Sequence, residues 1–492
     1  NKGKDFRNDQ FFGDGLFFTP EWDTAYKYAN ANVNNSLDIS LLDKAKKVNK
    51  LLGSFMSDLF YKGNSSWRDE KHQKFYDWLE KADIKVKDLT YSIDANEIAE
   101  SLGQNVSSDD EFRWFRIQKG YKMNLPAPVK EFALPQAAIF PDAGVAYMHT
   151  SLQNPETNLM LSVRSSPFGS LAHTHSDQNT FNIAYGGKRL FYNSGYRPAM
   201  GDPHFLGWHK HTQGHNGILI DGEGQPFSDG AFGWLPRFLT GEQISYAVGD
   251  ASHAYAGKVE GKNIDWGLKF FRRHYILLRP SIIVIYDELE SEHNAEWSWL
   301  LHNDKGFEID AVNQTILAES EFTKAKISLF SSSEIDFRVT DQFSVPVDNW
   351  TNKVDEDGEK LLFENQWHFK GVSKKKTSRM RYLAIIQAKP DGSFEQAINN
   401  NNDKFTVGNW NIKVQMDTSK PANIQVWNND NSASLVSSGT LVINGKTFSG
   451  KELGSSKLVE MIAGESVFQE AIDEIPEAIQ IAMKRDSIKS NK

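Results

Sequence analysis

The segment LKFFRRHYILLRPSIIVIYDEL, residues 268–289, decides the fold class of this chain. Two runs of apolar, β-branched and aromatic residues flank the turn residues Arg279, Pro280 and Ser281, a pattern typical of paired strands. Similar short segments recur on both sides, from AIFPDAGVAYMHT at residues 138–150 to RYLAIIQA at residues 381–388. So many closely spaced strands, with few helices between them, predict a large antiparallel β-sandwich over residues 126–395.

The sequence on either side of this region has a different pattern. LLDKAKKVNKLLGSFMSDLF, residues 41–60, repeats apolar residues at helical spacing, and residues 67–83 and 94–102 give two further amphipathic patterns. INNNNDKF, residues 398–405, precedes a few more short strand patterns and a charged helical tail. The chain is therefore predicted to be an α+β multidomain protein, with a helical domain at 1–125, the sandwich at 126–395, and a small β region with a helical tail at 396–492.

The composition excludes several classes of protein. The net charge of −9 comes without any long Lys/Arg run, which argues against a nucleic-acid partner. No apolar run approaches the roughly 18 residues of a membrane span, and the absence of cysteine removes disulfides and thiolate sites. A chain that starts at Asn1, without Met or a signal peptide, is expected to be a mature or truncated product. We expect a bacterial protein of the periplasm or the extracellular space.

Histidines are concentrated in one part of the chain. Of the 13 in the sequence, six lie between His173 and His215, among Ser, Asp, Gln and Asn residues. His173 and His175 form an H-x-H pair, which in a strand would present both imidazoles on one face. Paired imidazoles suit metal ligation, proton transfer or carboxylate binding, whereas the simpler interpretation is a polar sheet face.

The ordered series of motifs in this region resembles one family. SPFGSLAHTHSDQNTF (166–181), KRLFYNSGY (188–196) and HNGILIDGEGQ (215–225) are similar to the heparinase II/III-like polysaccharide lyases, as are YAVGDASHAY (246–255) and the segment quoted first. That family includes glycosaminoglycan and alginate lyases built from an α/α toroid and a β-sandwich. The resemblance implies that the N-terminal helices are part of a toroid and that no organic cofactor is needed.

The same resemblance implies roles for individual residues. His173 would polarise the uronate carboxylate or take part in proton transfer, and Tyr26 or Tyr28 would be the catalytic tyrosine, although the residues before them do not reproduce the family's spacing. His175 and His215 would hold a structural zinc ion together with the residue at position 193. Relatives that bind zinc have aspartate there, whereas this chain has Asn193, a neutral and weaker ligand.

Other residues are candidates for binding an anionic polysaccharide. Gln178 and Asn179 are potential donors to the substrate carboxylate, although Asn179 also suits buried backbone groups. The loop between the two key strands adds further candidates, namely Tyr196, Arg197, Trp208 and His211. For Trp208 the sequence allows two roles, stacking against a sugar ring or packing in the core. Arg273 would reach a sugar acid unless it forms an ion pair with Asp250 or Asp287.

The predicted function is β-elimination at uronic acid residues, with alginate as the first substrate and a glycosaminoglycan as the second. A hydrolase would need two carboxylates beside the bond, and only Asp177 and Asp202 accompany the histidines. A metal enzyme of the cupin type would need a further Glu and a distal His at regular spacing. The main alternative is a non-catalytic glycan-binding or accessory protein that retains the sandwich. The oligomeric state, including a homodimer, is left open.

Overall fold

The computed structural model describes residues 11–12, 15–16, 135–197, 201–347, 364–399, 403–443, 445–448 and 454–480. The chain divides into two compact units, with the boundary between Phe132 and Ala133. In the first unit the described residues form one antiparallel pair, β1 (Phe11–Phe12) with β2 (Gly15–Leu16). The predicted helices lie outside the described residues, and so do Tyr26 and Tyr28.

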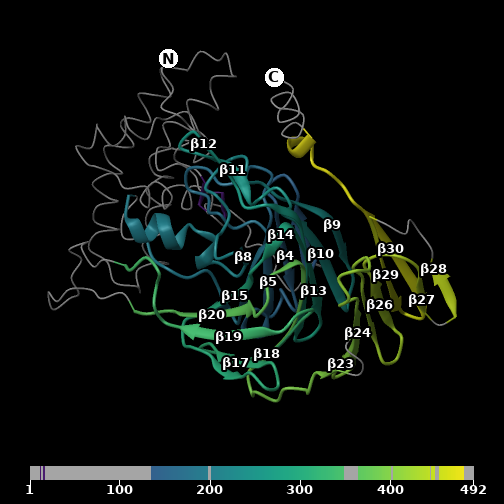
Figure 1. Ribbon diagram of the computed structural model, residues 1–492. Coiled ribbons are helices and arrows are strands. Elements are labelled where there is room, and N and C mark those ends of the chain that lie inside the picture. The colour runs from purple at the N-terminus through teal and green to yellow at the C-terminus, as the bar shows by residue number, and fades with distance from the viewer. Residues whose placement is uncertain are drawn as a thin grey trace, which may run out of the picture. The chain divides into compact units, whose positions relative to one another are not determined.

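The second unit is built around an eight-stranded antiparallel sheet, and its β-sandwich confirms the prediction made from the strand patterns (Figure 1). The segment quoted first forms its central hairpin, with Leu278 paired to Ile282. In spatial order the strands are β16 (Glu308–Asp310), β17 (Thr315–Glu319), β18 (Lys324–Ser331), β21 (Thr377–Lys389), β14 (Ile282–Ala295), β13 (Leu268–Leu278), β10 (Ile244–Asp250) and β9 (Trp234–Thr240).

The inner strands of this central sheet, such as β10, β14 and β21, are largely buried on both faces, whereas the edge strand β16 is exposed. Along β14, Ile283 and Ile285 belong to one hydrophobic cluster. Ile282, Val284 and Tyr286 belong to another. Because successive side chains of a strand point to opposite faces, the two clusters are the two faces of one sheet.

Two smaller sheets contribute to the first cluster. One has the strands β3 (Ala137–Phe140), β4 (Val145–His149), β5 (Leu159–Arg164), β6 (Thr180–Tyr185) and β7 (Lys188–Phe191). The other has the order β19 (Ile335–Thr340), β20 (Trp367–Ser373), β15 (Trp297–Asn303) and β8 (Ile218–Ile220). Alternate residues of β5, such as Leu159 and Leu161, enter this cluster. Short elements complete the region, namely the 3-10 helix η5 (Pro155–Thr157) and the hairpin of β11 (Ala256–Val259) with β12 (Lys262–Asp265).

A seven-stranded C-terminal sheet packs on the other face of the central sheet, where its apolar residues complete the second cluster (Figure 1, yellow). Its order is β22 (Ile398–Asn399), β23 (Lys404–Val407), β24 (Trp410–Val414), β25 (Ile424–Asn428), β26 (Ala433–Val436), β29 (Ser455–Ile462) and β30 (Glu465–Ile472). β27 (Leu441–Ile443) pairs with β28 (Lys446–Phe448), and residues 477–480 are helical. Among the residues described, no helix is both long and apolar enough to cross a membrane.

Candidate functional site

Two loops of the five-stranded sheet bring most of the clustered histidines together. The first, here called the H-x-H loop, is residues 165–179 between β5 and β6. The second, the connecting loop, is residues 192–217 between β7 and β8, and it contains the π-helix η6 (Phe205–His209) and the 3-10 helix η7 (Thr212–Gly214). The amide of Ser176 donates to the carbonyl of Lys210 at 2.8 Å, and the Thr212 hydroxyl donates to the Ser176 carbonyl at 2.7 Å. The loops are therefore held to each other by backbone contacts.

The expectation that the H-x-H pair lies in a strand is wrong. Residues 171–174 form a turn, in which the amide of Thr174 donates to the carbonyl of Leu171 at 3.0 Å. Ala172 has the left-handed φ of 51°, which no strand residue adopts. His173 on this turn and His175 after it are both half-buried, and Leu171 on the same turn is exposed. The H-x-H pair therefore does not present two imidazoles on one face of a strand.

His175 and His215 form a direct imidazole pair. The Nδ1 of His215 lies 2.9 Å from the carbonyl oxygen of His211, which can only accept, so this nitrogen carries the proton. In the neutral ring Nε2 of His215 is then the acceptor, and Nδ1 of His175 donates to it at 3.0 Å. The ring of His209 stands edge-on to His175, with the centroids 4.9 Å apart.

His175, His209 and His211 are neutral at pH 7 because they are buried. Burial lowers the pKa of His175 well below its ordinary value, and the charges of His215 and His209 lower it further. Burial, followed by the charge of His215, lowers the pKa of His209 to about 4 and that of His211 to about 4. A cluster of neutral imidazoles can accept protons or ligate metals, but it supplies no fixed positive charge.

Gln178 and Asn179 do not reach a substrate, contrary to the prediction. Both side chains are fully buried. The Oε1 of Gln178 accepts from the amide of Ser166 at 2.5 Å. The Nδ2 of Asn179 donates to the carbonyls of Gly249 at 3.1 Å and Phe271 at 3.2 Å. A Cβ at Gly249 would lie 2.1 Å from Oδ1 of Asn179, so glycine makes room for this amide. The alternative that Asn179 satisfies buried backbone groups is confirmed.

Arg273 is also a structural residue, and its prediction as a substrate contact is wrong. Its guanidinium is fully buried and forms two hydrogen bonds to the Asp287 carboxylate, at 2.5 and 2.9 Å. It also donates to the carbonyls of Asn179 and Asn216. The ion pair considered as the alternative for this residue is therefore the correct one. Strand alternation sends the neighbouring Arg272 to the opposite face, where it pairs with Asp250 at 2.9 Å.

Trp208 packs in the core and does not provide an open sugar platform. It is 2% exposed, its indole nitrogen donates to the Ser194 hydroxyl at 3.0 Å, and its ring centroid lies 4.6 Å from that of His368. Tyr196 is half-buried, and its phenol donates to the carbonyl of Glu364 at 2.6 Å.

Arg197 and His211 complete the predicted set in the connecting loop. Arg197 is exposed, with its guanidinium 5.4 Å from the centre of the Phe205 ring. His211 is half-buried, and its Nδ1 accepts from the amide of Gln213 at 3.2 Å. Of the four candidates in this loop, Arg197 is thus the most accessible to a ligand.

The donors near His175 do not make a full zinc site. His215 resembles a ligand histidine in that a carbonyl fixes its Nδ1 proton, but its Nε2, the nitrogen that would have to coordinate, accepts a hydrogen bond from Nδ1 of His175. Asn193 is followed by Ser194, and the amide of Ser194 donates to the carbonyl of Gly214, the residue before His215, at 2.7 Å. No group of three or more His, Cys, Asp or Glu that could hold a metal occurs in the part of the chain described. Two imidazoles and a neutral amide fall short of the three or four strong ligands that zinc sites use. Zinc at these residues stays a prediction, and no step below depends on it.

A second imidazole pair lies behind the connecting loop, and no pattern in the sequence indicates it. His302 on β15 and His368 on β20 are buried, with their Nδ1 atoms 3.3 Å apart. They lie 87 and 153 residues after His215 in the chain, and only the pairing of β15 with β20 brings them together. Lys210, between His209 and His211, was also missed, although the density of histidines around it pointed to this loop.

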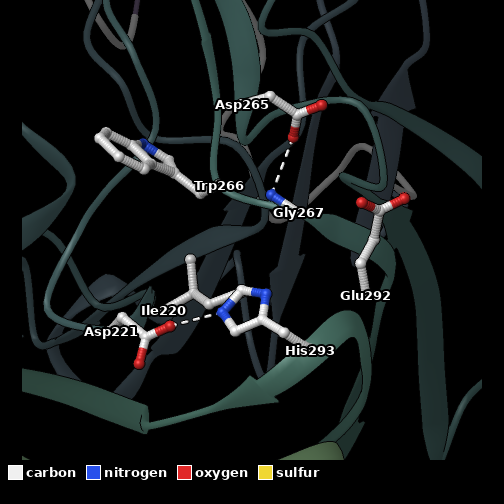
Figure 2. Close-up of a pocket in the computed structure, with 7 residues that line it drawn as sticks. All are labelled: Ile220, Asp221, Asp265, Trp266, Gly267, Glu292 and His293. Carbon is white, nitrogen blue, oxygen red and sulfur yellow. Dashed lines mark hydrogen bonds and ion pairs between the residues drawn. The ribbon is translucent and has the colours of Figure 1, made fainter.

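A pocket of about 320 Å³ lies at the end of β8, and none of the clustered histidines lines it (Figure 2). Asp221, Asp265 and Glu292 contribute its carboxylates, and the Asp221 carboxylate bonds to Nε2 of His293 at 2.6 Å. Its acidic lining disfavours an anionic sugar polymer. By contrast, positive charges surround the two histidine loops: Arg189 contributes to the low pKa of His209, and Arg197 to that of Lys210.

The sequence profile described as heparinase II/III-like, C-terminal, matches residues 133–404, more than half of the chain. The chain belongs to this family. The matched residues include both histidine-bearing loops and the central sheet. Among curated proteins, none matches the chain.

Solved structures of the heparinase III type are also similar to this chain. A heparinase III gene product gives a TM-score of 0.44 at 15% identity, over 70% of this chain and 45% of its own length. Heparan sulfate lyase HepC from Pedobacter heparinus gives 0.42 at 12% identity, over 87% of this chain and 61% of its own length. The chain therefore spans less than two thirds of these two proteins, and similarity at this level bears on neither activity nor substrate.

Proposed function

We propose that this chain is a polysaccharide lyase that cleaves a uronic-acid-containing polymer by β-elimination and leaves 4,5-unsaturated products. The observation that carries the proposal is the place of His173 on the H-x-H loop, which hydrogen bonds join to the loop of His209, His211 and His215, all within the family-matched residues 133–404. The positive charges of Arg189 and Arg197 near the same loops suit a carboxylate-bearing substrate.

The chemistry assigns His173 a task at the uronate. The C5 proton is barely acidic while the adjacent carboxylate is negative, so the site has to neutralise that carboxylate, remove the proton and protonate the leaving oxygen. His173 would hydrogen-bond the carboxylate or take part in the proton transfer. A phenol can both accept and return a proton, and we assign that role to Tyr26 or Tyr28, which lie outside the described residues.

Among polymers, we place a glycosaminoglycan before alginate. The family takes its name from heparinases, and heparin is a glycosaminoglycan. Hydrolysis is a weaker option because both nearby carboxylates are occupied. Asp177 pairs with Arg164 at 2.8 Å, and Asp202 accepts from the amide of Phe205 at 3.1 Å. We also propose a location outside the cytoplasm, where such polymers occur.

A non-catalytic glycan-binding protein is the second candidate, and one observation favours it. Four predicted substrate contacts, Gln178, Asn179, Trp208 and Arg273, are buried in the core. Of the other predicted residues described, Arg197 is exposed, and His173, Tyr196 and His211 are half-buried.

Ultraviolet absorbance of the unsaturated product separates the two functions. The chain is incubated with heparan sulfate, heparin, hyaluronan, chondroitin sulfate and alginate, beside His173→Ala and the matched control His293→Ala from the acidic pocket. Absorbance that rises with one polymer, is abolished in His173→Ala and is kept in His293→Ala supports the lyase. Binding of a polymer without any product supports the accessory protein.

A further inference from the structure

The side chain of Lys210 reaches across from the connecting loop to the H-x-H loop. Lys210 is only 4% exposed, and its Nζ donates to the carbonyl of Ala172, the residue before His173. The ammonium lies 3.9 Å from the centre of the Phe227 ring and 5.5 Å from that of Phe205. Such contacts favour a cation over a neutral side chain of the same size.

The carbonyl that Lys210 holds belongs to a strained residue. Ala172 has a φ of 51°, a conformation that is unfavourable for a residue with a Cβ and persists only where neighbours impose it. Within the turn, the amide of Leu171 donates to the Thr174 hydroxyl at 2.6 Å, and the Ser170 hydroxyl donates to the carbonyl of His175 at 2.8 Å. Lys210 adds the bond from the second loop that reaches the peptide joining Ala172 to His173.

We infer that Lys210 is a positioning residue, which fixes the strained turn and thereby holds the His173 imidazole in one orientation. This inference rests on the proposed function for its effect on catalysis, but not for its effect on the turn. Burial, and then the charge of Arg197, lower the pKa of Lys210 to about 8, so the side chain remains mostly protonated at pH 7.

Two substitutions separate positioning from simple packing. Lys210→Met keeps the apolar stem against Phe205 and Phe227 but removes the donor and the charge, whereas Lys210→Arg keeps both. The matched control is Lys404→Met, because the Nζ of Lys404 also lies over a ring, 5.3 Å from the centre of Trp427, in the C-terminal sheet. Circular dichroism and urea unfolding show whether each variant is folded.

The first measurement is the NMR signal of the His173 imidazole in the histidine-labelled full chain, assigned by its loss in His173→Ala. We expect Lys210→Met to shift and broaden this signal, and Lys210→Arg and Lys404→Met to leave it near its original position. An unchanged His173 signal in folded Lys210→Met overturns the inference. If Lys210→Met does not fold, Lys210→Gln, which is neutral and too short by one atom to reach Ala172 in the same way, replaces it, and an unchanged signal there has the same meaning.

The second measurement is the split between kcat and KM on the polymer that the chain cleaves. A misplacement of about 1 Å costs on the order of 100-fold in rate, so we expect Lys210→Met to lower kcat by up to that factor with KM little changed. Lys210→Arg should restore most of kcat. Equal kcat values for wild type and Lys210→Met would contradict the proposed effect of Lys210 on catalysis. A chain with no activity on any polymer refutes the lyase, while the NMR result still decides the role of Lys210 in the turn.

Discussion

Nδ1 of His175 donates to Nε2 of His215 across 3.0 Å, and this bond joins the H-x-H loop to the connecting loop. Its direction is fixed from outside the pair, since the carbonyl of His211 holds the proton of His215 on Nδ1. Both rings are then neutral and have defined tautomers. The candidate site is therefore organised by a chain of hydrogen bonds that runs from a backbone carbonyl through two imidazoles.

The first prediction concerns this pair. His215→Ala removes the acceptor of a buried N–H, and a buried donor left without a partner costs about 1–3 kcal/mol. We expect the free energy of unfolding, measured in urea, to fall by that amount. In the double variant with His175→Ala, part of the loss should be recovered, because the orphaned donor is gone. His293→Ala, whose ring is half-exposed, is the control and should stay near wild type; equal losses in all three variants would contradict the pair.

The second prediction is a loss of stability in acid. Burial lowers the pKa of His209 and His211 to about 4 and that of His368 to about 3, whereas an unfolded chain has histidines near pKa 6.5. Below pH 6.5 the unfolded chain binds more protons, so the stability that these groups contribute is complete above that pH and declines toward about pH 4. Each one lowers the free energy of unfolding by about 1.4 kcal/mol per pH unit in this window.

Urea midpoints between pH 7.5 and pH 4.5 check this expectation. Carboxylates also titrate near the lower end, so the informative comparison is with His209→Gln, whose amide can still donate to the carbonyl of Ser194 that His209 bonds at 3.2 Å. As the pH falls, the free energy of unfolding of this variant should decrease less steeply than that of the wild type, because one histidine fewer takes up a proton on unfolding. Parallel curves for the two proteins would show that His209 is not kept neutral by the fold.

The third prediction tests whether Arg273 is structural. Arg273→Met leaves the Asp287 carboxylate buried and unpaired, which costs about 3–5 kcal/mol. Its remaining folded fraction should show an unchanged KM. Arg197→Met, at an exposed position, should change stability by less than about 0.5 kcal/mol but raise KM if the sugar acid binds there. A raised KM in Arg273→Met, with stability near wild type, would show that Arg273 contacts the substrate and is not a structural residue.

The sequence predicted the sandwich well because strand patterns carry their own signal. In residues 268–289 two apolar runs around a turn are enough to indicate a hairpin, whichever sheet it joins. It did not predict which polar residues are buried. Arg273 and Gln178 look like ligand contacts in the sequence. Only the pairing of β13 with β14 and the folding of the H-x-H loop on itself give them internal partners.

The H-x-H pattern also led to a wrong expectation, because these residues form a turn and not a strand. The H-x-H spacing suggests two imidazoles on one face of a strand, but Ala172 is left-handed and the residues around it form a turn. The density of histidines did identify the connecting loop correctly. His302 and His368 could not be found in this way, because their contact depends on the pairing of two strands that are far apart in the sequence.

The fourth prediction concerns zinc. Asn193→Asp supplies the anionic ligand that this chain lacks beside His175 and His215, and Asp is a stronger ligand than a neutral amide for this ion. We expect zinc affinity, measured by equilibrium dialysis of the full chain, to rise by about tenfold or more. Adding His215→Ala to the variant should abolish the gain, because Nε2 of His215 is the nitrogen that would bind zinc in place of its hydrogen bond to His175. If zinc affinity is the same in wild type and Asn193→Asp, position 193 does not face the two imidazoles, and the proposed ligand set is incorrect.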